Sequence, residues 1–193
     1  PDGRFVALGL HTPRLDLPDR CALVYDLQTS RWLNELPTRG LAQVRFSPRG
    51  KFLAVHSGET MECRIFETAS WKLVTTINSK SLGIFSPDET LFAIACGAGD
   101  VSLRKDSELR EFARLSGPDV ETFHPLFFAG DNSRLYACNS ATRQIHFWNL
   151  ALIRKSLAEL NLAGDWPEIS LASSPDVVPA PLSVTGEISS SEP

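Results

Sequence analysis

The chain has 193 residues and a formal net charge of −4, with 42% hydrophobic and 22% charged residues, a composition typical of one soluble globular domain. Its apolar runs are only a few residues long, far short of the roughly 20 that span a bilayer. No dense run of Lys and Arg appears, whereas nucleic-acid-binding proteins carry a concentrated basic surface. We therefore expect neither a membrane nor a nucleic acid as a partner.

A turn phrase recurs along the chain and divides it into repeats. The phrase FSPRGKFLAV around Pro48 returns as FSPDETLFAI around Pro87, while PDGRFVALG opens the chain and FFAGDNSRLYAC contains Gly130 at the position of the proline. Pro1, Pro48, Pro87 and Gly130 are 47, 39 and 43 residues apart. A period of roughly 40 to 45 residues is that of a four-stranded propeller blade. The sequence therefore predicts an all-β fold built from similar units.

Each unit is expected to contribute strands in the same order. A short innermost strand ends before the turn of Pro, Gly and Asp. A nearly continuous apolar strand follows, as FVALGL, FLAVHS, LFAIAC and RLYACN, which indicates burial on both faces. A third strand alternates more, as CALVYDL, MECRIFET, DVSLR and QIHFWNL. A more polar fourth strand, as RWLNELP, KLVTTI and REFARL, suits an outer edge.

The first and last units are each predicted to lack one strand. The second and third kinds of strand occur four times, whereas the first and fourth kinds occur three times. We therefore expect fourteen strands, with no innermost strand in the first unit and no outermost strand in the last. Propellers typically have 4 to 8 blades, so the chain is predicted to hold about four blades of an incomplete propeller.

After the last strand the pattern becomes helical and then polar. Apolar residues recur at spacings of three, four and three, which indicates one face of an amphipathic helix with Asn149 as N-cap and Gly164 as its end. We predict propeller blades over residues 1–149 and a helix over 150–164 that packs on the last blade. Residues 165–193 are Ser/Pro-rich and acidic, and we expect them to form a disordered tail.

The turn phrase before an apolar strand resembles the WD40 repeat family. The third strand of three units ends in an aromatic residue followed by an acid or an amide, similar to the Trp-Asp pair of these repeats: Tyr25-Asp26, Phe66-Glu67 and Trp148-Asn149. The third unit has Arg104-Lys105 instead, and the usual Gly-His before the innermost strand is missing. The resemblance covers residues 1 to about 149 and implies a β-propeller.

The ending LIRKSLAELNLAGDWP is similar to the helix that follows WD40 repeats in large multidomain bacterial proteins, some with an upstream serine/threonine kinase domain. This second resemblance implies a bacterial, cytoplasmic protein of which the chain is a fragment. The first implies a non-catalytic scaffold that binds a protein partner or another domain of the same chain. The alternative is the regulatory or sensor part of a multidomain enzyme such as a kinase, or a hydrolase-like propeller.

No residue pattern predicts a catalytic, cofactor-binding or metal site, and no cofactor is expected. The cysteines are far apart, unlike the close Cys-x-x-Cys pairs of metal sites, and we interpret them as buried free thiols in a reducing compartment: Cys21, Cys63, Cys96 and Cys138. The histidines are interpreted as packed or edge residues, with a composite site left open: His11, His56, His124 and His146.

Two stretches superficially suit catalysis or phosphate binding. GAGDVS at residues 97–102 has Ser102 where a dinucleotide fingerprint needs a third glycine, and a strand instead of a helix follows, which favours a hairpin turn. Ser47 and Ser86 in the FSP turns have no Gly-x-Ser-x-Gly elbow around them. Their recurrence at one repeat position indicates a role in the turn.

The remaining candidates are contact residues. Trp32 and Trp71 fall near outer strands, where an aromatic side chain either packs between neighbouring edges or anchors a partner. The insertion HTPRLDLPDR at residues 11–20 lengthens one hairpin loop, and loops carry function more often than the scaffold does. Its charged side chains are candidates for a partner contact on one face of the propeller: Arg14, Asp16, Asp19 and Arg20.

Overall fold

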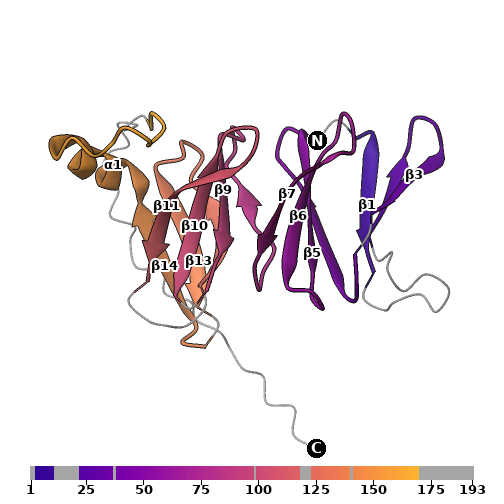
Figure 1. Cartoon of the computed structure of the whole chain (residues 1–193), viewed down its shortest axis with the longest axis horizontal. Helices are drawn as coiled ribbons and strands as arrows, with labels where there is room; N and C mark the ends of the chain where they lie inside the picture. The colour runs from indigo at the N-terminus through magenta and orange to yellow at the C-terminus, as the bar shows by residue number, and fades with distance from the viewer. Residues whose placement is uncertain are drawn as a thin grey trace, which may run out of the picture.

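A computed structural model describes residues 3–10, 22–36, 38–97, 99–117, 123–139 and 141–169. Four antiparallel sheets lie side by side in chain order (Figure 1). Sheet 1 contains β1 (Phe5–Gly9), β2 (Ala22–Asp26) and β3 (Arg31–Leu36). Sheet 2 contains β4 (Ala42–Phe46), β5 (Phe52–Ser57), β6 (Glu62–Glu67) and β7 (Leu73–Asn78). Sheet 3 contains β8 (Ile84–Phe85), β9 (Leu91–Ala95), β10 (Asp100–Lys105) and β11 (Arg110–Ser116), and sheet 4 contains β12 (Phe123–Phe128), β13 (Arg134–Asn139) and β14 (Gln144–Asn149).

Over the described residues, the predicted all-β fold with fourteen strands is confirmed. Within the described residues, sheets 2 and 3 have four strands each, whereas sheets 1 and 4 have three. Sheet 1 begins with the second kind of strand, and helix α1 (Leu150–Glu159) follows β14 where the other units have an outer strand. The units therefore form an open array of four blades. In the described part, no helix has the length and apolar character that crossing a membrane requires.

The recurring phrase has the same backbone turn in three units. The first residue of each turn donates its N–H to the carbonyl five residues later, from Ser47 at 2.9 Å, from Ser86 at 2.9 Å and from Ala129 at 2.8 Å. The fourth residue of each turn has a left-handed φ: 78° at Gly50, 62° at Glu89 and 60° at Asn132. Glycine and asparagine adopt this conformation more readily than other residues, which explains Gly50 and Asn132, whereas Glu89 is a residue type that rarely adopts it.

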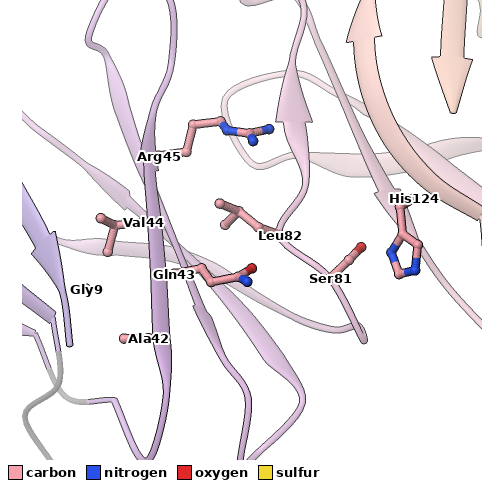
Figure 2. Close-up of a pocket in the computed structure, with 8 residues that line it drawn as sticks. All are labelled: Gly9, Ala42, Gln43, Val44, Arg45, Ser81, Leu82 and His124. Atoms are coloured by element: carbon pink, nitrogen blue, oxygen red, sulfur yellow. The ribbon is translucent and has the colours of Figure 1, made fainter. Parts of the chain in front are cut away.

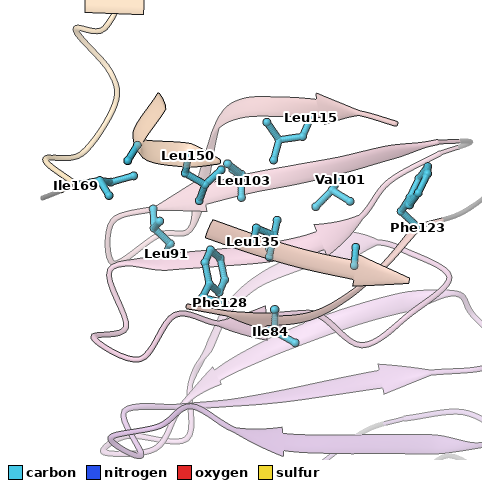
Figure 3. Close-up of a cluster of buried hydrophobic side chains, with 13 residues drawn as sticks. Ile84, Leu91, Val101, Leu103, Leu115, Phe123, Phe128, Leu135, Leu150 and Ile169 are labelled. Atoms are coloured by element: carbon cyan, nitrogen blue, oxygen red, sulfur yellow. The ribbon is translucent and has the colours of Figure 1, made fainter. Parts of the chain in front are cut away.

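The hydrophobic cores lie between neighbouring sheets. In β5, Leu53 and Val55 face sheet 1, while Phe52 and Ala54 face sheet 3, so both sides of the strand are buried. This arrangement explains the nearly continuous apolar runs of the second strands. The core between sheets 3 and 4 is shown in Figure 3 and also contains residues of α1 and the segment after it. Its buried residues are Ile84, Leu91, Ala93, Val101, Leu103, Leu115, Phe123, Phe128, Leu135, Ala137, Leu150, Ala151 and Ile169.

Helix α1 starts at the point where other units turn towards their outer strand. The Asn149 Oδ1 atom accepts a hydrogen bond from the Leu152 N–H at 2.9 Å, as expected of an N-cap. Asp26 holds the corresponding place in unit 1, and its Oδ1 atom accepts from the Gln28 N–H at 2.8 Å. A side-chain oxygen at the same repeat position thus accepts the hydrogen bond that begins a turn in unit 1 and a helix in unit 4. Leu150 anchors the helix because it is fully buried in the core.

The helix ends earlier than the predicted residue 164. Asn161 has a φ of 57°, and its N–H donates to the Ala158 carbonyl at 3.0 Å, while the Leu162 N–H donates to the Leu157 carbonyl at 2.8 Å. This pair of bonds is the Schellman motif that closes a helix. Asparagine adopts the left-handed conformation here, so the helix does not extend to Gly164.

The segment after the helix folds back over sheets 3 and 4. Trp166 packs edge-on against Phe112 with 5.3 Å between ring centroids, and the Lys105 Nζ atom donates to the Asp165 carbonyl. Ile169 is buried in the core between the two sheets. Residues 165–169, which were predicted to belong to the tail, are therefore packed, whereas 170–193 lie outside the described residues.

Candidate functional site

Two of the described histidines make local contacts within the array. The His56 Nε2 atom is 3.0 Å from the Ser79 carbonyl oxygen, and His56 is buried. His146 packs edge-on against Phe123 with 4.8 Å between ring centroids. His11 lies outside the described residues. In the part of the chain that the structure describes, no group of three or more His, Cys, Asp or Glu residues is placed to hold a metal ion.

The serines of the FSP turns are bonded within their turns. The Ser47 Oγ atom accepts from the Phe52 N–H at 2.9 Å, and Ser86 Oγ accepts from the Leu91 N–H at 2.9 Å. Ser86 Oγ also donates to Asp88 at 2.7 Å. Both serines are almost fully buried. Through these bonds the two hydroxyl groups hold their turns together, as their recurrence at one repeat position predicts.

The glycine-rich stretch joins β9 to β10 as a hairpin connection. Gly97 and Gly99 have φ values of 70° and 78°, which glycine adopts without steric cost. Of the cysteines, Cys63 is buried between sheets 2 and 3, and burial raises the pKa of its thiol to about 12. Cys96 and Cys138 are half-buried free thiols, and Cys21 lies outside the described residues.

The two tryptophans near outer strands differ in their surroundings. Trp71 packs edge-on against Phe5 at 5.2 Å and thereby joins sheet 2 to sheet 1, which is packing between neighbouring units. Trp32 is 55% exposed and packs edge-on against Tyr25 of its own sheet at 5.0 Å. The insertion at residues 11–20 lies outside the described residues.

Sheet 1 leaves an apolar surface exposed, which we call the N-terminal end face. Phe5 and Ala7 face sheet 2, so the alternate residues of β1 point away from the array. These are Val6 and Leu8, which are 38% and 42% exposed. The register places Val6 opposite Tyr25, and Tyr25 opposite Trp32. The N-terminal end face consists of Val6, Leu8, Tyr25 and Trp32.

The same repeat positions are buried inside the array. The turn phrases align Val6 and Leu8 with Leu53 and Val55 in β5 and with Phe92 and Ile94 in β9. Those four interior residues are at most 1% exposed, because each faces the preceding sheet. The N-terminal end face therefore has the same apolar repeat positions as the interfaces between neighbouring blades inside the array.

Sheet 4 exposes a second apolar surface, the C-terminal end face, which consists of Phe127, Tyr136, Ile145 and Phe147. Tyr136 stacks on Phe127 with 4.5 Å between centroids and lies 5.8 Å from Phe147, which makes a continuous aromatic row across three strands. Phe127 and Phe147 are 52% and 60% exposed. Exposed apolar patches are common at sites of protein–protein contact, so we treat this row as a candidate contact surface.

The aromatic row distinguishes the C-terminal end face from the interfaces inside the array. The position of Tyr136 is occupied by alanine in the other three units. Ala54 and Ala93 are fully buried there and allow the next sheet to approach. Because a tyrosine needs more space than an alanine, a sheet could not approach the C-terminal end face as closely as the sheets inside the array approach one another.

The third unit replaces the aromatic-acid pair by a polar network. The Arg104 Nη1 atom donates to the Leu109 carbonyl at 2.9 Å, and Ser102 Oγ donates to Glu111 at 2.7 Å. Burial raises the pKa of Glu111, but the bonds from Ser102 and Arg114 outweigh burial and lower it overall. The departure from the repeat pattern is therefore compensated by bonds within sheet 3.

A hollow of about 540 Å³ lies on the inner side of the array, where the edges formed by β4, β8 and β12 converge. Figure 2 shows Gln43 and Arg45 on the side of β4 that faces Ser81, Leu82 and His124. We call this space the inner hollow. All four units contribute to it, and its lining residues are Gly9, Ala42, Gln43, Val44, Arg45, Ser81, Leu82 and His124.

No protein-family model and no curated protein matches the chain. Solved structures do match it, and their likeness to this chain is one of fold. The Cps50 (Swd1) β-propeller domain of Myceliophteria thermophila has a TM-score of 0.56 at 15% identity, over 76% of this chain and 50% of that chain. A chain of the mitotic checkpoint complex has a TM-score of 0.57 at 18% identity, over 77% of this chain and 46% of that one.

A chain of hydrazine synthase from Kuenenia stuttgartiensis is also similar, with a TM-score of 0.52 at 17% identity over 68% of this chain and 40% of that chain. The chain thus spans half or less of the length of these solved structures. The fold of these solved structures agrees with the four antiparallel sheets and the repeated turn of this chain. The chain therefore has a β-propeller fold, as the resemblance of its repeats predicts, and its described residues form an incomplete array of four blades.

Proposed function

We propose that the chain is a non-catalytic interaction scaffold and that it forms part of a larger β-propeller. The observation that carries the proposal is the exposure of both end faces. Val6 and Leu8 are exposed at repeat positions where Leu53 and Val55 are buried inside the array. Apolar surface removed from water contributes about 25 cal/mol per Å², so a neighbouring blade on each end face would stabilise the array.

The two end faces support different contacts. The N-terminal end face repeats the aliphatic pattern of the interior interfaces and therefore fits another blade of the same kind. The C-terminal end face presents the aromatic row of Phe127, Tyr136 and Phe147, and aromatic residues are enriched at protein interfaces. We assign it to a contact with a protein partner or with another part of a longer chain.

A chain of this fold occurs in a protein assembly, since one similar solved structure is a chain of the mitotic checkpoint complex. This similarity supports the scaffold proposal.

A second proposal is that the chain is the regulatory or sensor part of a multidomain enzyme. It is supported by the similarity to a chain of hydrazine synthase, which is by name an enzyme. In that proposal the catalytic domain lies elsewhere in a longer chain.

The intact mass of the polypeptide in its native cell tests the larger propeller. The 193 residues of the sequence have a mass of 21.2 kDa. A much larger mass is expected, and the longer sequence would then reveal whether kinase motifs are present. A mass near 21 kDa would contradict the proposal and leave self-association of the end faces as the way to cover them.

Cross-linking in the native cell tests the scaffold. We expect a protein or domain to be cross-linked through the C-terminal end face, with the cross-link lost in Phe147→Ser. Leu73→Ser is the matched control, because Leu73 is 52% exposed on β7 and lies on neither end face. The scaffold proposal fails when both variants retain the same cross-links as the natural chain.

A further inference from the structure

A histidine and a cysteine lie opposite each other on two strands of sheet 4. His124 of β12 is the direct register partner of Cys138 of β13. The residues on either side of each are buried, and Phe123 and Ala137 belong to the core between sheets 3 and 4. Because side chains alternate along a strand, the half-buried His124 and Cys138 point away from sheet 3. They therefore lie on the same side as the C-terminal end face, where Ile145 is the next register partner of Cys138.

The pairing brings two metal-binding groups close together. Residues directly opposite each other in an antiparallel pair have Cβ atoms roughly 4.5–5.5 Å apart. One ion can reach both, because a Zn–S bond is about 2.3 Å long and a Zn–N bond about 2.0–2.1 Å. Cys138 is a free thiol, and within the described residues the His124 side chain makes no hydrogen bond or ion pair. Both groups are thus available to a ligand.

The chemistry of the two groups selects zinc. Thiolate sulfur and imidazole nitrogen are ligands of Zn²⁺, whereas Ca²⁺ and Mg²⁺ prefer oxygen. Structural zinc sites are four-coordinate and include sets of two cysteines with two histidines. In the described part of the chain, no third His, Cys, Asp or Glu is placed to complete such a set. His124 and Cys138 therefore supply half of a zinc site.

A second copy of the chain would supply the other half. In a two-fold contact both copies offer the same surface, so two pairs of His124 and Cys138 give two sulfur and two nitrogen ligands. Sheets packed face to face are about 10 Å apart, a spacing that two cysteine side chains with an ion between them can span. The same contact would remove the exposed Phe127 and Phe147 from water, which is favourable.

We propose that two copies of the chain associate through their C-terminal end faces around one Zn²⁺ ion, held by His124 and Cys138 of each copy. Each thiol releases its proton to solvent on binding, and each imidazole binds in its neutral form. Spacing along the chain does not predict this site, because the two residues belong to different strands. The inference rests on the proposed scaffold function, because it names the partner of the C-terminal end face.

Zinc-dependent association of the 193-residue chain is the test. Sedimentation velocity compares the chain in a chelator with the chain in half an equivalent of Zn²⁺. We expect a monomer of 21.2 kDa to become a dimer, with one ion bound for two chains in a calorimetric titration. Co²⁺ in place of Zn²⁺ should show the visible absorption of a tetrahedral ion and a thiolate charge-transfer band. Absence of zinc binding, a dimer that needs no metal, or one ion per monomer would overturn the proposal.

Variants connect the ion to the pair. Cys138→Ser and His124→Gln should each weaken Zn²⁺ binding by more than the roughly 10–100-fold that loss of an outer partner of a metal ligand costs, and both should remain monomers. Cys96→Ser is the matched control, because Cys96 is also a half-buried free thiol but follows β9 in sheet 3. Equal thermal unfolding in chelator shows which variants are folded, and either ligand variant alone suffices. A folded ligand variant that still dimerises with Zn²⁺ would refute the assignment.

Failure of this inference is distinguishable from failure of the scaffold function. Cross-links through the C-terminal end face report any partner, whereas the sedimentation experiment reports only a second copy joined by zinc. A different protein in the cross-links, with a chain that stays monomeric in Zn²⁺, refutes the zinc bridge alone. A zinc-dependent dimer in solution, without cross-links through this face in the native cell, supports the zinc bridge and contradicts the scaffold contact.

Discussion

The hydroxyl group of Ser86 is a single polar group whose removal should destabilise the fold measurably. Ser86→Ala removes both the acceptor for the Leu91 N–H and the donor to Asp88. Ser86 and Leu91 are 0% and 1% exposed, so water does not replace the lost acceptor. A buried polar group without a partner costs about 1–3 kcal/mol. We expect the free energy of unfolding to fall by that amount, out of roughly 5–15 kcal/mol for a domain.

The same substitution should change the stability at acidic pH. Burial raises the pKa of Asp88, but hydrogen bonds from Ser86, Thr90 and Asn132 outweigh burial and lower it to about 2. Because this folded-state pKa is below the usual 3.8, the stability contributed by the carboxylate is fully present above pH 4 and is lost as the pH falls towards 2. Without the Ser86 bond the pKa is lowered less, so the acid-dependent loss becomes smaller.

Urea unfolding followed by tryptophan fluorescence, at neutral pH and near pH 3, measures both effects. At neutral pH Ser47→Ala should also lower the free energy of unfolding, but by less than Ser86→Ala, because it removes the acceptor for the Phe52 N–H, whereas Ser86→Ala also removes the donor to Asp88. Ala129→Ser places a hydroxyl at the third copy of the turn, but the N–H that would donate to it belongs to exposed Arg134, so we expect a change within about 0.5 kcal/mol. An unchanged midpoint for Ser86→Ala, or a large gain for Ala129→Ser, would refute the reasoning.

Three further predictions concern the helix, a close backbone contact and a thiol. Asn149→Ala removes the N-cap and should lower stability by about 1 kcal/mol, with less helix in far-UV circular dichroism; an unchanged spectrum and midpoint would contradict the cap. Gly9→Ala would put a Cβ atom 2.1 Å from the Ala42 carbonyl oxygen and should lower the thermal midpoint, whereas Gly130→Ala has open space and should not. Cys63, whose pKa burial raises to about 12, should react with a thiol reagent only on unfolding, and rapid labelling of the folded chain would disprove its burial.

Much of the fold could be predicted because each unit repeats a local physical requirement. The turn needs a left-handed residue such as Gly50, and the second strand needs apolar residues on both sides because sheets cover both. The end of the helix could not be predicted in the same way. Asn161 takes the left-handed conformation three residues before Gly164, and the sequence pattern does not show which of the two residues closes the helix.

The candidate surfaces were predictable to different degrees. Alignment of the repeats places Tyr136 at the position of Ala54 and Ala93, so the aromatic row has a visible signal in the sequence. The inner hollow has none, because Arg45, Ser81 and His124 come from three different units and meet only when the sheets stand side by side. Spacing along the chain carries no information about such a meeting point.

Each described core lies between two neighbouring sheets, so a single unit does not contain a complete core of its own. The smallest piece that keeps one complete core is a pair of neighbouring units. Sheets 2 and 3 each contribute to two cores, so deletion of either would open apolar surface on both sides, whereas deletion of an end unit would open it on one. Within this array of four units, removal of a whole repeat is therefore least disruptive at either end of the array, because stacking depends on nearest neighbours alone.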